Sequence, residues 1–563
     1  MIGVLCRRED AAVFAEFFEL FKTPWEPYEP GREYDVVLAV GVDVPPIEAG
    51  LLVIYGAGAS LTEEPLGAAA ALRSAGGVLR YRDTPLPIYG ALLTFAEQEP
   101  DTAYVCTEDG AIAGLRIRRG ALTVVRLGYD LAQEVRALLS VGQPAAHAGV
   151  PAVDMHIAML RELILEAGLP LVEIPPVPAG APFAVCLTHD IDFAGIRHHR
   201  LDHTAWGFLY RATVGSLRRV LGGRLSLARC AQSWRAAVSL PLVYLGWVKD
   251  FWEPFGWYLR TEDGLPATYF LIPFKGRSGD RVPGPHASRR AAGYALADVA
   301  SAAIMLRQRG CELGVHGIDA WHSVDKGRAE LERIAALTGD GTRIGVRMHW
   351  LLRDEQTPRV VEDAGYAWDS SHGYNETVGY LNGTTQPFRP KGATSLIELP
   401  LHIQDGALFY PERLNLSEAD AWRRCERLIE NASACGGVLT VLWHDRSHAP
   451  ERFWGDFYIR LVNALEARGA WFGTAGQVVE WFAKRRRVRF ERTATGIRLR
   501  YHGDAISPAL TLRVHGRQSA DHRPEQAALW TDISWAGDDL EEVERRLTHV
   551  VQREAASTHG AAA

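Results

Sequence analysis

The chain has 563 residues, a formal net charge of -7 at pH 7 and a sequence pI near 6.3. This acidic balance argues against nucleic acid as a partner, because binding a phosphate backbone needs a basic surface. Seven scattered cysteines form no paired motif, and the first residues carry too short an apolar run for a secretory signal. We therefore expect a cytoplasmic protein of roughly two to four domains.

The first 142 residues (1–142) are predicted to form an α/β domain. Three short apolar segments are typical of buried strands, at 2–6, 35–41 and 51–56. A helical pattern lies between the first two of them, at 10–22. The pattern then changes to short β segments with glycine-containing turns at 87–127, followed by amphipathic helices at 130–139 and 153–167.

Residues 143–182 are predicted to form a helical connector that ends in a stiff linker. The stretch 173–182 contains four prolines in ten residues. Proline has no N–H to donate and a fixed φ, so neither a helix nor a central strand continues through such a run. We therefore place a domain boundary at the end of this stretch.

Residues 183–484 alternate strand-like and helix-like segments, which favours a parallel α/β sheet or barrel. The predicted strands are 183–188, 267–272, 311–316, 343–347, 396–401, 437–443 and 470–473. Helical patterns separate several of them, at 294–309, 326–337, 416–434 and 456–468. In barrels of this kind the catalytic residues gather at the C-terminal ends of the strands.

A long insertion at 196–260 interrupts this domain. It is rich in arginine, leucine and tryptophan, and we favour a helical cap packed on the barrel. The alternative is a lid, or a surface for a lipid-linked substrate, with peripheral membrane contact through 236–260. Pro241 breaks the apolar run 236–248, which is too short to span a bilayer, so we expect no transmembrane segment.

The end of the chain, residues 485–563, is predicted to form a small β-rich domain with a terminal helix. Polar and apolar residues alternate with period 2 in parts of 488–532, which is typical of half-buried strands. A charged helical pattern follows at 537–554. Packing on the barrel is the favoured role of this unit, and glycan binding is the alternative.

The most informative stretch is 183–192, Phe-Ala-Val-Cys-Leu-Thr-His-Asp-Ile-Asp. An apolar strand that ends in two carboxylates is costly unless the acids have partners. Alternate side chains of an extended chain share a face, so Thr188, Asp190 and Asp192 point one way and His189 the other. We therefore expect Asp190 and Asp192 to face a site, with His189 behind it or in the core.

Two histidines further along are candidates for metal ligands. His316 ends a short buried strand pattern, and His322 follows six residues later. That spacing separates two side chains by about 240° on a helix and ~20 Å on a strand, so only a turn or bulge would bring both to one ion. Asp319 is the competing ligand. We predict a divalent metal, most often Zn²⁺ in such sites, held by Asp192, His316 and His322, with positions left open for catalysis.

Other polar residues suggest how acid–base chemistry would run beside this ion, which would activate water and polarise a carbonyl. Asp190 would take the proton of the water, and the guanidinium of Arg347 would hold that carboxylate ionised. His444 follows a buried strand pattern and is placed to protonate a leaving amine. Asp369 is predicted to orient His444.

The ordered motifs resemble those of the polysaccharide deacetylase family, also called carbohydrate esterase family 4, with the NodB-homology fold. They are Thr188-His-Asp-Ile-Asp192, Glu312-Leu-Gly-Val-His316, Arg347-Met-His-Trp350 and Leu442-Trp-His444. The resemblance covers roughly 183–482 and implies a distorted (β/α) barrel that uses a divalent metal, usually zinc, to remove acetyl groups from N-acetylated sugars. It implies the same roles for Asp190, Arg347, His444 and the three metal ligands.

Three motifs depart from the family's pattern. The first carries an extra residue between its two acids, as in a variant branch, and the histidine spacing of the second is longer. In the third, His349 stands where the family usually has proline, and Trp350 where it has an aromatic residue. We predict Trp350 and Trp443 as walls of the substrate groove. The N-terminal domain resembles the flavodoxin-like or amidotransferase-like layers attached to some family members.

Together these features predict a metal-dependent hydrolase of linear amide C–N bonds. Its substrate would be an N-acetyl group on a sugar or glycan precursor in cell-envelope or exopolysaccharide metabolism. The alternatives are an amidase acting on a non-sugar amide, and a non-catalytic glycan-binding or scaffold protein that has lost its metal. Two histidines and a carboxylate also suit the Fe(II) of an oxygenase. The strand–helix alternation does not resemble the all-β fold of those enzymes.

Overall fold

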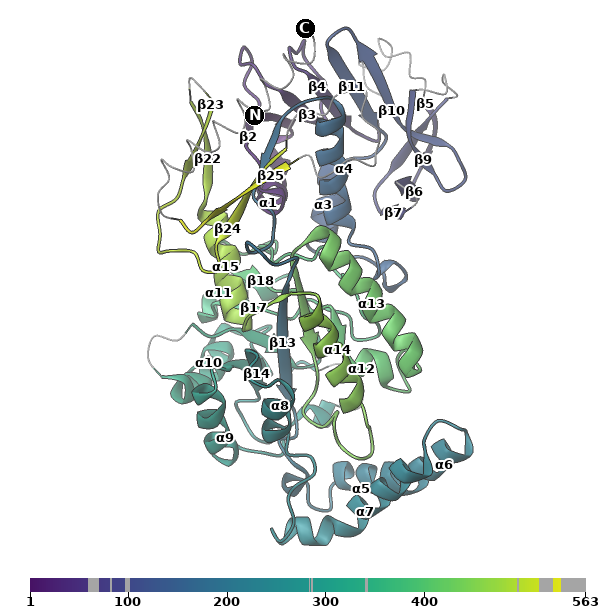
Figure 1. Ribbon diagram of the computed structural model, residues 1–563, viewed down its shortest axis with the longest axis vertical. Helices are drawn as coiled ribbons and strands as arrows, with labels where there is room; N and C mark the ends of the chain where they lie inside the picture. Colours follow the sequence, from purple (N-terminus) through teal and green to yellow (C-terminus); the bar gives the residue numbers. More distant parts are fainter. Residues whose placement is uncertain are drawn as a thin grey trace.

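The computed structural model describes residues 1–58, 70–81, 84–96, 102–282, 284, 287–339, 343–493, 496–515 and 530–537. Its parts follow one another along the longest axis (Figure 1). The N-terminal sheet lies at the top of that view, the barrel in the middle, and a helical hairpin from the insertion at the bottom. Apart from Gly537, the helix predicted at 537–554 lies outside the described residues.

The N-terminal unit is built on one mixed sheet. Its strands are β1 (Ile2–Cys6), β2 (Trp25–Pro27), β3 (Val36–Val40), β4 (Leu51–Tyr55), β5 (Ala70–Ser74), β6 (Gly77–Tyr81), β7 (Thr84–Ile88), β8 (Leu92–Phe95), β9 (Ala103–Thr107), β10 (Ile112–Arg119) and β11 (Leu122–Leu127). They run in the order β2-β1-β3-β4-β11-β10-β9-β6-β7, with β8 joining β5 to β10. In this order, the neighbouring strands β2, β1, β3, β4 and β11 pair in parallel. The pairs from β11 to β7 are antiparallel.

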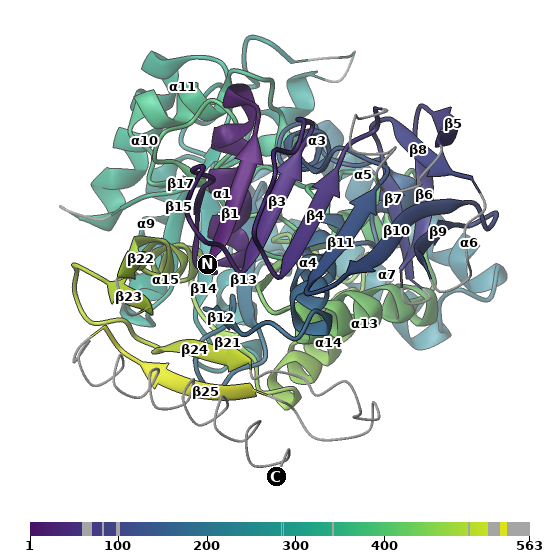
Figure 2. The same ribbon diagram turned by 90° about the horizontal axis from the view of Figure 1, so that it is seen from above.

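Helix α1 (Ala11–Phe21) shows why this sheet has a buried face. Phe14, Phe17, Phe18 and Phe21 recur at helical spacing and are all almost completely buried. Helices α3 (Leu131–Leu138) and α4 (Ala152–Glu166) contribute to the same hydrophobic core. Figure 2 shows β1, β3, β4 and β11 side by side, as their pairing requires.

The central unit is a parallel sheet with helices packed against it. Its strands are β13 (Ala184–Ile191), β14 (Ala267–Leu271), β15 (Glu312–Gly317), β16 (Val346–Met348), β17 (Trp368–Asp369), β18 (Ile397–Glu398), β19 (Ile403–Gln404), β20 (Val438–Leu442) and β21 (Trp471–Phe472). The order is β18-β17-β16-β15-β14-β13-β20-β19, and β21 pairs with β13. Within the described residues no ladder joins β18 to β19, so the sheet forms an incomplete barrel.

Helices alternate with these strands, as the sequence pattern predicted. They are α8 (Phe255–Thr261), α9 (Leu296–Gln308), α10 (Val324–Thr338), α11 (Thr357–Ala364), α12 (Asp405–Phe409), α13 (Glu418–Cys435), α14 (Gly455–Ala467) and α15 (Ala475–Arg487). All eight residues of β13 are buried, and the strand pairs with β14 on one side and β20 on the other. The motif 188–192 is therefore held at the middle of the sheet.

The insertion forms a helical hairpin. Its elements are α5 (His203–Tyr210), a π-helical turn η5 (Arg211–Gly215), α6 (Ser216–Leu221) and α7 (Leu227–Tyr244). A small core that includes Ile196, Phe208, Leu240 and Trp252 packs its inner side. Figure 1 shows the hairpin projecting from the end of the barrel. No helix among the described residues has both the length and the apolar character needed to cross a membrane.

The C-terminal strands share a sheet with the connector. Strand β12 (Leu171–Glu173) pairs with β24 (Leu510–His515), which pairs with β25 (Trp530–Trp535). A separate hairpin is formed by β22 (Arg489–Thr493) and β23 (Gly496–Arg500). The buried carboxylate of Glu173 accepts hydrogen bonds from Nε and Nη2 of Arg161 and lies 2.8 Å from Nε2 of His515. The connector therefore contributes structure to the end of the chain.

Buried polar contacts join the N-terminal unit to the barrel. The guanidinium of Arg485, at the end of α15, donates to the carbonyl oxygens of Leu20 and Ile174 at 3.0 and 2.6 Å. Asp154 on α4 accepts hydrogen bonds from the hydroxyl of Thr384 and the backbone N–H of Thr385 at 2.8 and 2.7 Å. Because buried polar groups need such partners, these bonds fix how the two units lie against each other.

Candidate active site

The predicted site residues come from the C-terminal ends of neighbouring parallel strands. β13 carries Asp190 just before its end, β15 carries His316, and β16 carries Arg347. His316 is paired in register with Arg347, and Thr188 with Leu442 of β20, two residues before His444. The strand order therefore brings motifs from 190, 316, 347 and 444 to one end of the sheet.

Three side chains form a cluster that suits a metal ion. Oδ1 of Asp192 lies 3.4 Å from Nε2 of His316 and 3.1 Å from Nδ1 of His349. The two imidazole nitrogens are 2.8 Å apart. All three ligand atoms lie within 4.8 Å of one another. Ligands at about 2.0 Å from a tetrahedral zinc are ~3.3 Å apart, so the cluster has the size of a metal shell.

The hydrogen bonds around this cluster also fit a metal. Oδ1 of Asp192 is buried without a hydrogen-bond partner among the described residues. Nδ1 of His316 lies 2.9 Å from the carbonyl oxygen of Arg347, an arrangement that leaves the lone pair of Nε2 facing Asp192. Burial lowers the pKa of His349 to about 4, which keeps its imidazole neutral as ligation requires. The residues present therefore fit a divalent cation.

The position predicted for His322 is taken by His349. Nε2 of His322 lies 3.1 Å from Oδ1 of Asp319, away from the cluster. Asp319, the competing candidate, also accepts from the backbone N–H of Asp280 and from Lys326. After β15, the backbone N–H groups of Ile318 and Asp319 donate hydrogen bonds to the carboxylate of Glu330 on α10. The turn that these bonds hold contains both Asp319 and His322.

His349 directly follows β16, and the chain turns sharply after it. Trp350 and Leu351 have φ values of 66° and 53°, in the left-handed region that residues other than glycine rarely adopt. The sequence contained a signal for this ligand: a histidine at a strand end, in the third motif, where the resembled family has proline. This histidine departs from that family's pattern, and it places an imidazole donor at the end of the strand.

Asp190 is held by a buried arginine. Nη1 of Arg347 donates to Oδ1 of Asp190 at 3.1 Å and to the hydroxyl of Thr188 at 2.7 Å. Its other nitrogens donate to the carbonyl and hydroxyl oxygens of Ser370. The second carboxylate oxygen of Asp190 lies 3.8 Å from Nε2 of His316. One oxygen of Asp190 is therefore fixed, and the other faces the metal cluster.

Asp405, which the sequence analysis did not single out, is the carboxylate beside His444. Its Oδ1 lies 2.5 Å from Nδ1 of His444, and its Oδ2 accepts the backbone N–H of His444 at 2.9 Å. The Ser447 hydroxyl also donates to it. Burial alone would lower the pKa of His444, but the charge and hydrogen bond of Asp405 raise it to about 10. The contact with Asp405 therefore favours the protonated imidazole of His444 at neutral pH.

Asp369, predicted to orient His444, lies elsewhere. It accepts a hydrogen bond from the hydroxyl of Ser371 at 2.5 Å, and burial raises its pKa to about 6. The reason is the strand order: β17, which carries Asp369, is separated from β20 by β16, β15, β14 and β13. Asp405 begins α12, directly after β19, and β19 is the strand that pairs with β20.

The two predicted tryptophan walls differ in burial. Trp350 is 37% exposed and lines a cavity of about 420 Å³ together with Asp192, His349 and His444. Trp443 is fully buried and packs against the rings of Phe457 and Tyr458. It forms part of the core and not of the groove. His189 is buried behind the site, as expected, with Nε2 2.7 Å from Glu262.

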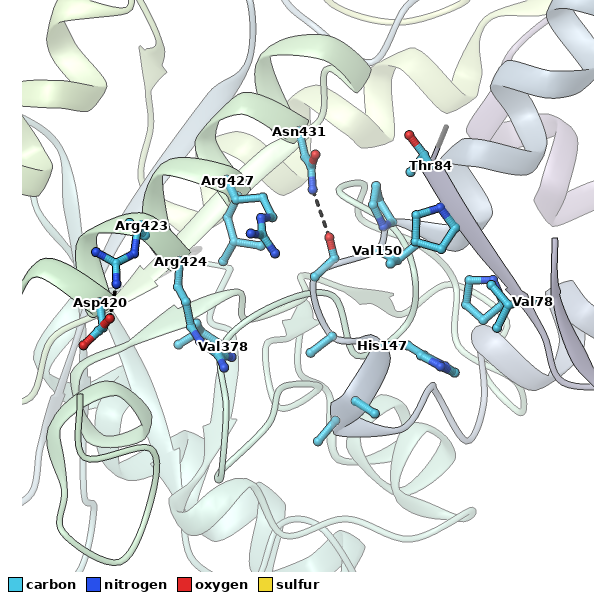
Figure 3. A pocket seen from close by; sticks show the side chains of 18 of the residues that line it. Val78, Thr84, His147, Val150, Val378, Asp420, Arg423, Arg424, Arg427 and Asn431 are labelled. Atoms are coloured by element: carbon cyan, nitrogen blue, oxygen red, sulfur yellow. Dashed lines mark hydrogen bonds and ion pairs between the residues drawn. The ribbon is translucent and has the colours of Figure 1, made fainter. Parts of the chain in front are cut away.

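Four arginines line the same cavity as Asp192, His349 and His444, and they are Arg289, Arg290, Arg413 and Arg446. A larger cavity of about 990 Å³ lies between the N-terminal unit and α13, lined by residues that include Thr84, His147 and Arg427 (Figure 3). It contains none of the three cluster residues.

Comparison with known proteins gave structural similarities only. No family model and no curated protein sequence matches the chain. Among solved structures, it is similar to a protein from Mycobacterium smegmatis described as a polysaccharide deacetylase, at 17% identity and a TM-score of 0.32, covering 55% of this chain and 95% of that one. A Pseudomonas aeruginosa PAO1 protein described in the same way gives 12% identity and a TM-score of 0.33, with 53% and 90% covered.

The chain is also similar to the PuuE allantoinase, at 14% identity and a TM-score of 0.34, covering 55% of this chain and 93% of that one. Polysaccharide deacetylases are thus among the structures that it resembles, as the motifs predicted. At TM-scores of this size, we take the function from the site residues alone.

Proposed function

We propose that this protein is a metal-dependent hydrolase that removes an N-acetyl group from a sugar or glycan precursor. The observation that supports this best is the meeting of three groups at one end of the sheet. They are the Asp192–His316–His349 cluster, the Asp190–Arg347 pair and the His444–Asp405 pair. Amide hydrolysis needs an activated water, a base and an acid, and each has a candidate here.

A divalent metal held by Asp192, His316 and His349 would supply an activated water and polarise the acyl carbonyl. Asp190 accepts the proton of that water through the oxygen that Arg347 leaves free. His444 donates its proton to the nitrogen of the breaking C–N bond, so that an amine leaves. Asp405 positions the His444 ring and balances its charge. The products are acetate and the free amino sugar.

The first test is acetate release with and without metal. We expect purified protein to release acetate from N-acetylglucosamine oligomers, to lose this activity after chelation, and to regain it with Zn²⁺. Metal-free protein that stays fully active would exclude the metal-dependent reaction. Tight zinc binding without acetate release from any N-acetyl sugar would favour the amidase on a non-sugar amide, and no metal binding would favour the non-catalytic alternative.

Replacing Asp405 with asparagine should shift the pH dependence. The native pKa of His444 is raised to about 10, so the imidazole keeps its proton well above neutral pH. Without the Asp405 charge this pKa falls, and the basic limb of the kcat/KM profile should move to lower pH. Asp369→Asn is the comparison: a shift in that variant, with none in Asp405→Asn, would show that Asp369 is the partner.

A further inference from the structure

The hairpin of α5, η5, α6 and α7, with the residues that flank it, carries most of the exposed large apolar side chains among the described residues. Among the described residues, thirteen of the twenty exposed large apolar side chains lie between Leu201 and Val248. Leu221 is 80% exposed and Trp247 is 76% exposed. Soluble proteins rarely leave a large apolar patch open to water, because burying it against a partner is favourable.

These side chains form regular stripes. On α5, η5 and α6 the exposed residues recur at steps of three or four, and they are Trp206, Tyr210, Val214, Leu217 and Leu221. On α7 and the residue that caps it, the exposed stripe is Leu227, Trp234, Val238, Leu242 and Leu245. The opposite side of α7 already packs inward, through residues that include Ala236, Leu240 and Val243. Each arm is thus apolar on an inner and an outer side.

The hairpin is also strongly basic. Residues 197–249 contain nine arginine or lysine residues and one acid, Asp202, in a chain whose net charge is -7. Arg200, Arg218, Arg235 and Lys249 are exposed. A second copy of this chain would bring two such basic surfaces together, which repulsion opposes. The charge instead complements a surface of closely spaced anions.

We propose that this hairpin docks the protein on the surface of an anionic lipid bilayer. The apolar stripes enter the boundary between headgroups and acyl chains, where tryptophan is favoured. The exposed arginines and Lys249 lie against the lipid phosphates, and each basic side chain adds to the affinity. Figure 1 shows that the hairpin projects away from the barrel, which leaves space for a flat surface beside it.

The hairpin borders a cavity that lies next to the one at the proposed active site. A cavity of about 860 Å³ lies between the hairpin and the barrel, and Arg211, Arg219 and Arg224 line it. It shares Tyr410 and Arg446 with the cavity lined by Asp192 and His349 of the metal cluster. The root of the insertion is fixed beside the cluster, because Asp445 accepts the backbone N–H groups of Phe193 and Ala194 at 2.7 and 2.9 Å.

The test is co-sedimentation of the full-length protein with vesicles, without any substrate. We expect binding to vesicles of phosphatidylglycerol mixed with phosphatidylcholine, weakening as salt is added, and much weaker binding to phosphatidylcholine alone. The double variant Trp247→Ser, Leu221→Ser should bind about tenfold more weakly or worse. Arg235→Glu and Lys249→Glu should each weaken binding to the anionic vesicles about fivefold or more.

Matched controls are exposed residues outside the hairpin. Ile304→Ser and Arg359→Glu should bind the vesicles like the unchanged protein. No binding to anionic vesicles, or equal binding to neutral ones, would overturn the proposal. So would a native dimer that Trp247→Ser, Leu221→Ser converts to monomer, since a second copy would then cover the stripes. Acetate release is measured separately, so either result leaves the proposed reaction to be judged by its own experiment.

Discussion

Replacing His349 with alanine is expected to weaken zinc binding by about a hundredfold or more, because the variant keeps only Asp192 and His316 of the cluster. The buried Oδ1 of Asp192 would also lose the imidazole nitrogen that lies 3.1 Å away. Zinc affinity measured by competition with a chelating dye gives the readout. It does not depend on finding the substrate.

The matched control for this prediction is His322→Ala. In the structure His322 bonds to Asp319 and does not contact the cluster, so its removal should leave zinc affinity within about twofold of the unchanged protein. Loss of zinc in His322→Ala, together with retention in His349→Ala, would restore the ligand set that the sequence suggested. Circular dichroism of both variants shows whether either loss comes from unfolding.

Asp190→Asn is expected to lower kcat by about 10²–10⁴-fold while zinc remains bound. Asparagine has nearly the same shape, and its side-chain oxygen can still accept from Arg347, but it cannot take up the proton of the attacking water. The variant distinguishes the role of a base from that of a metal ligand, because the loss of a base leaves the zinc ion bound and the loss of a ligand does not. Acetate release and zinc content measured on the same preparation test both statements.

Asp325→Asn is the control for that change. Asp325 is 97% exposed at the start of α10, so its loss of charge should leave kcat and zinc content unchanged. A similar kcat for Asp190→Asn and the unchanged protein would remove Asp190 from the reaction. Loss of zinc in Asp190→Asn would instead make it a fourth ligand, as its 3.8 Å distance from Nε2 of His316 would then allow.

Much of the sheet could be predicted from the sequence, because its strands are short apolar runs with a clear end. The strand expected at 183–188 is β13, extended in the structure to Ile191, and the one expected at 311–316 is β15. Parallel strands bring their C-terminal ends to the same side. For this reason the order of the motifs along the chain was enough to predict that Asp190, His316 and Arg347 lie close together.

The rest depended on information that local patterns do not carry. His444 has Asp405 as its partner because β19 pairs with β20, and β19 is only two residues long. A strand that short leaves no periodic signal. His349 stands directly before a sharp turn, in which Trp350 and Leu351 have left-handed backbone conformations that no hydrophobic pattern encodes. The incomplete barrel likewise reflects pairing between distant segments.

The pairing of β12 with β24 has a consequence for the boundaries of the protein. A fragment beginning at 183 would lack β12, and one ending at 484 would lack β24 and β25. Either cut removes part of one sheet and exposes strand edges that are otherwise paired. The sheet of β12, β24 and β25 joins the connector before the barrel to the end of the chain after it. We therefore expect the barrel to unfold together with these segments, and not to fold as a separate domain.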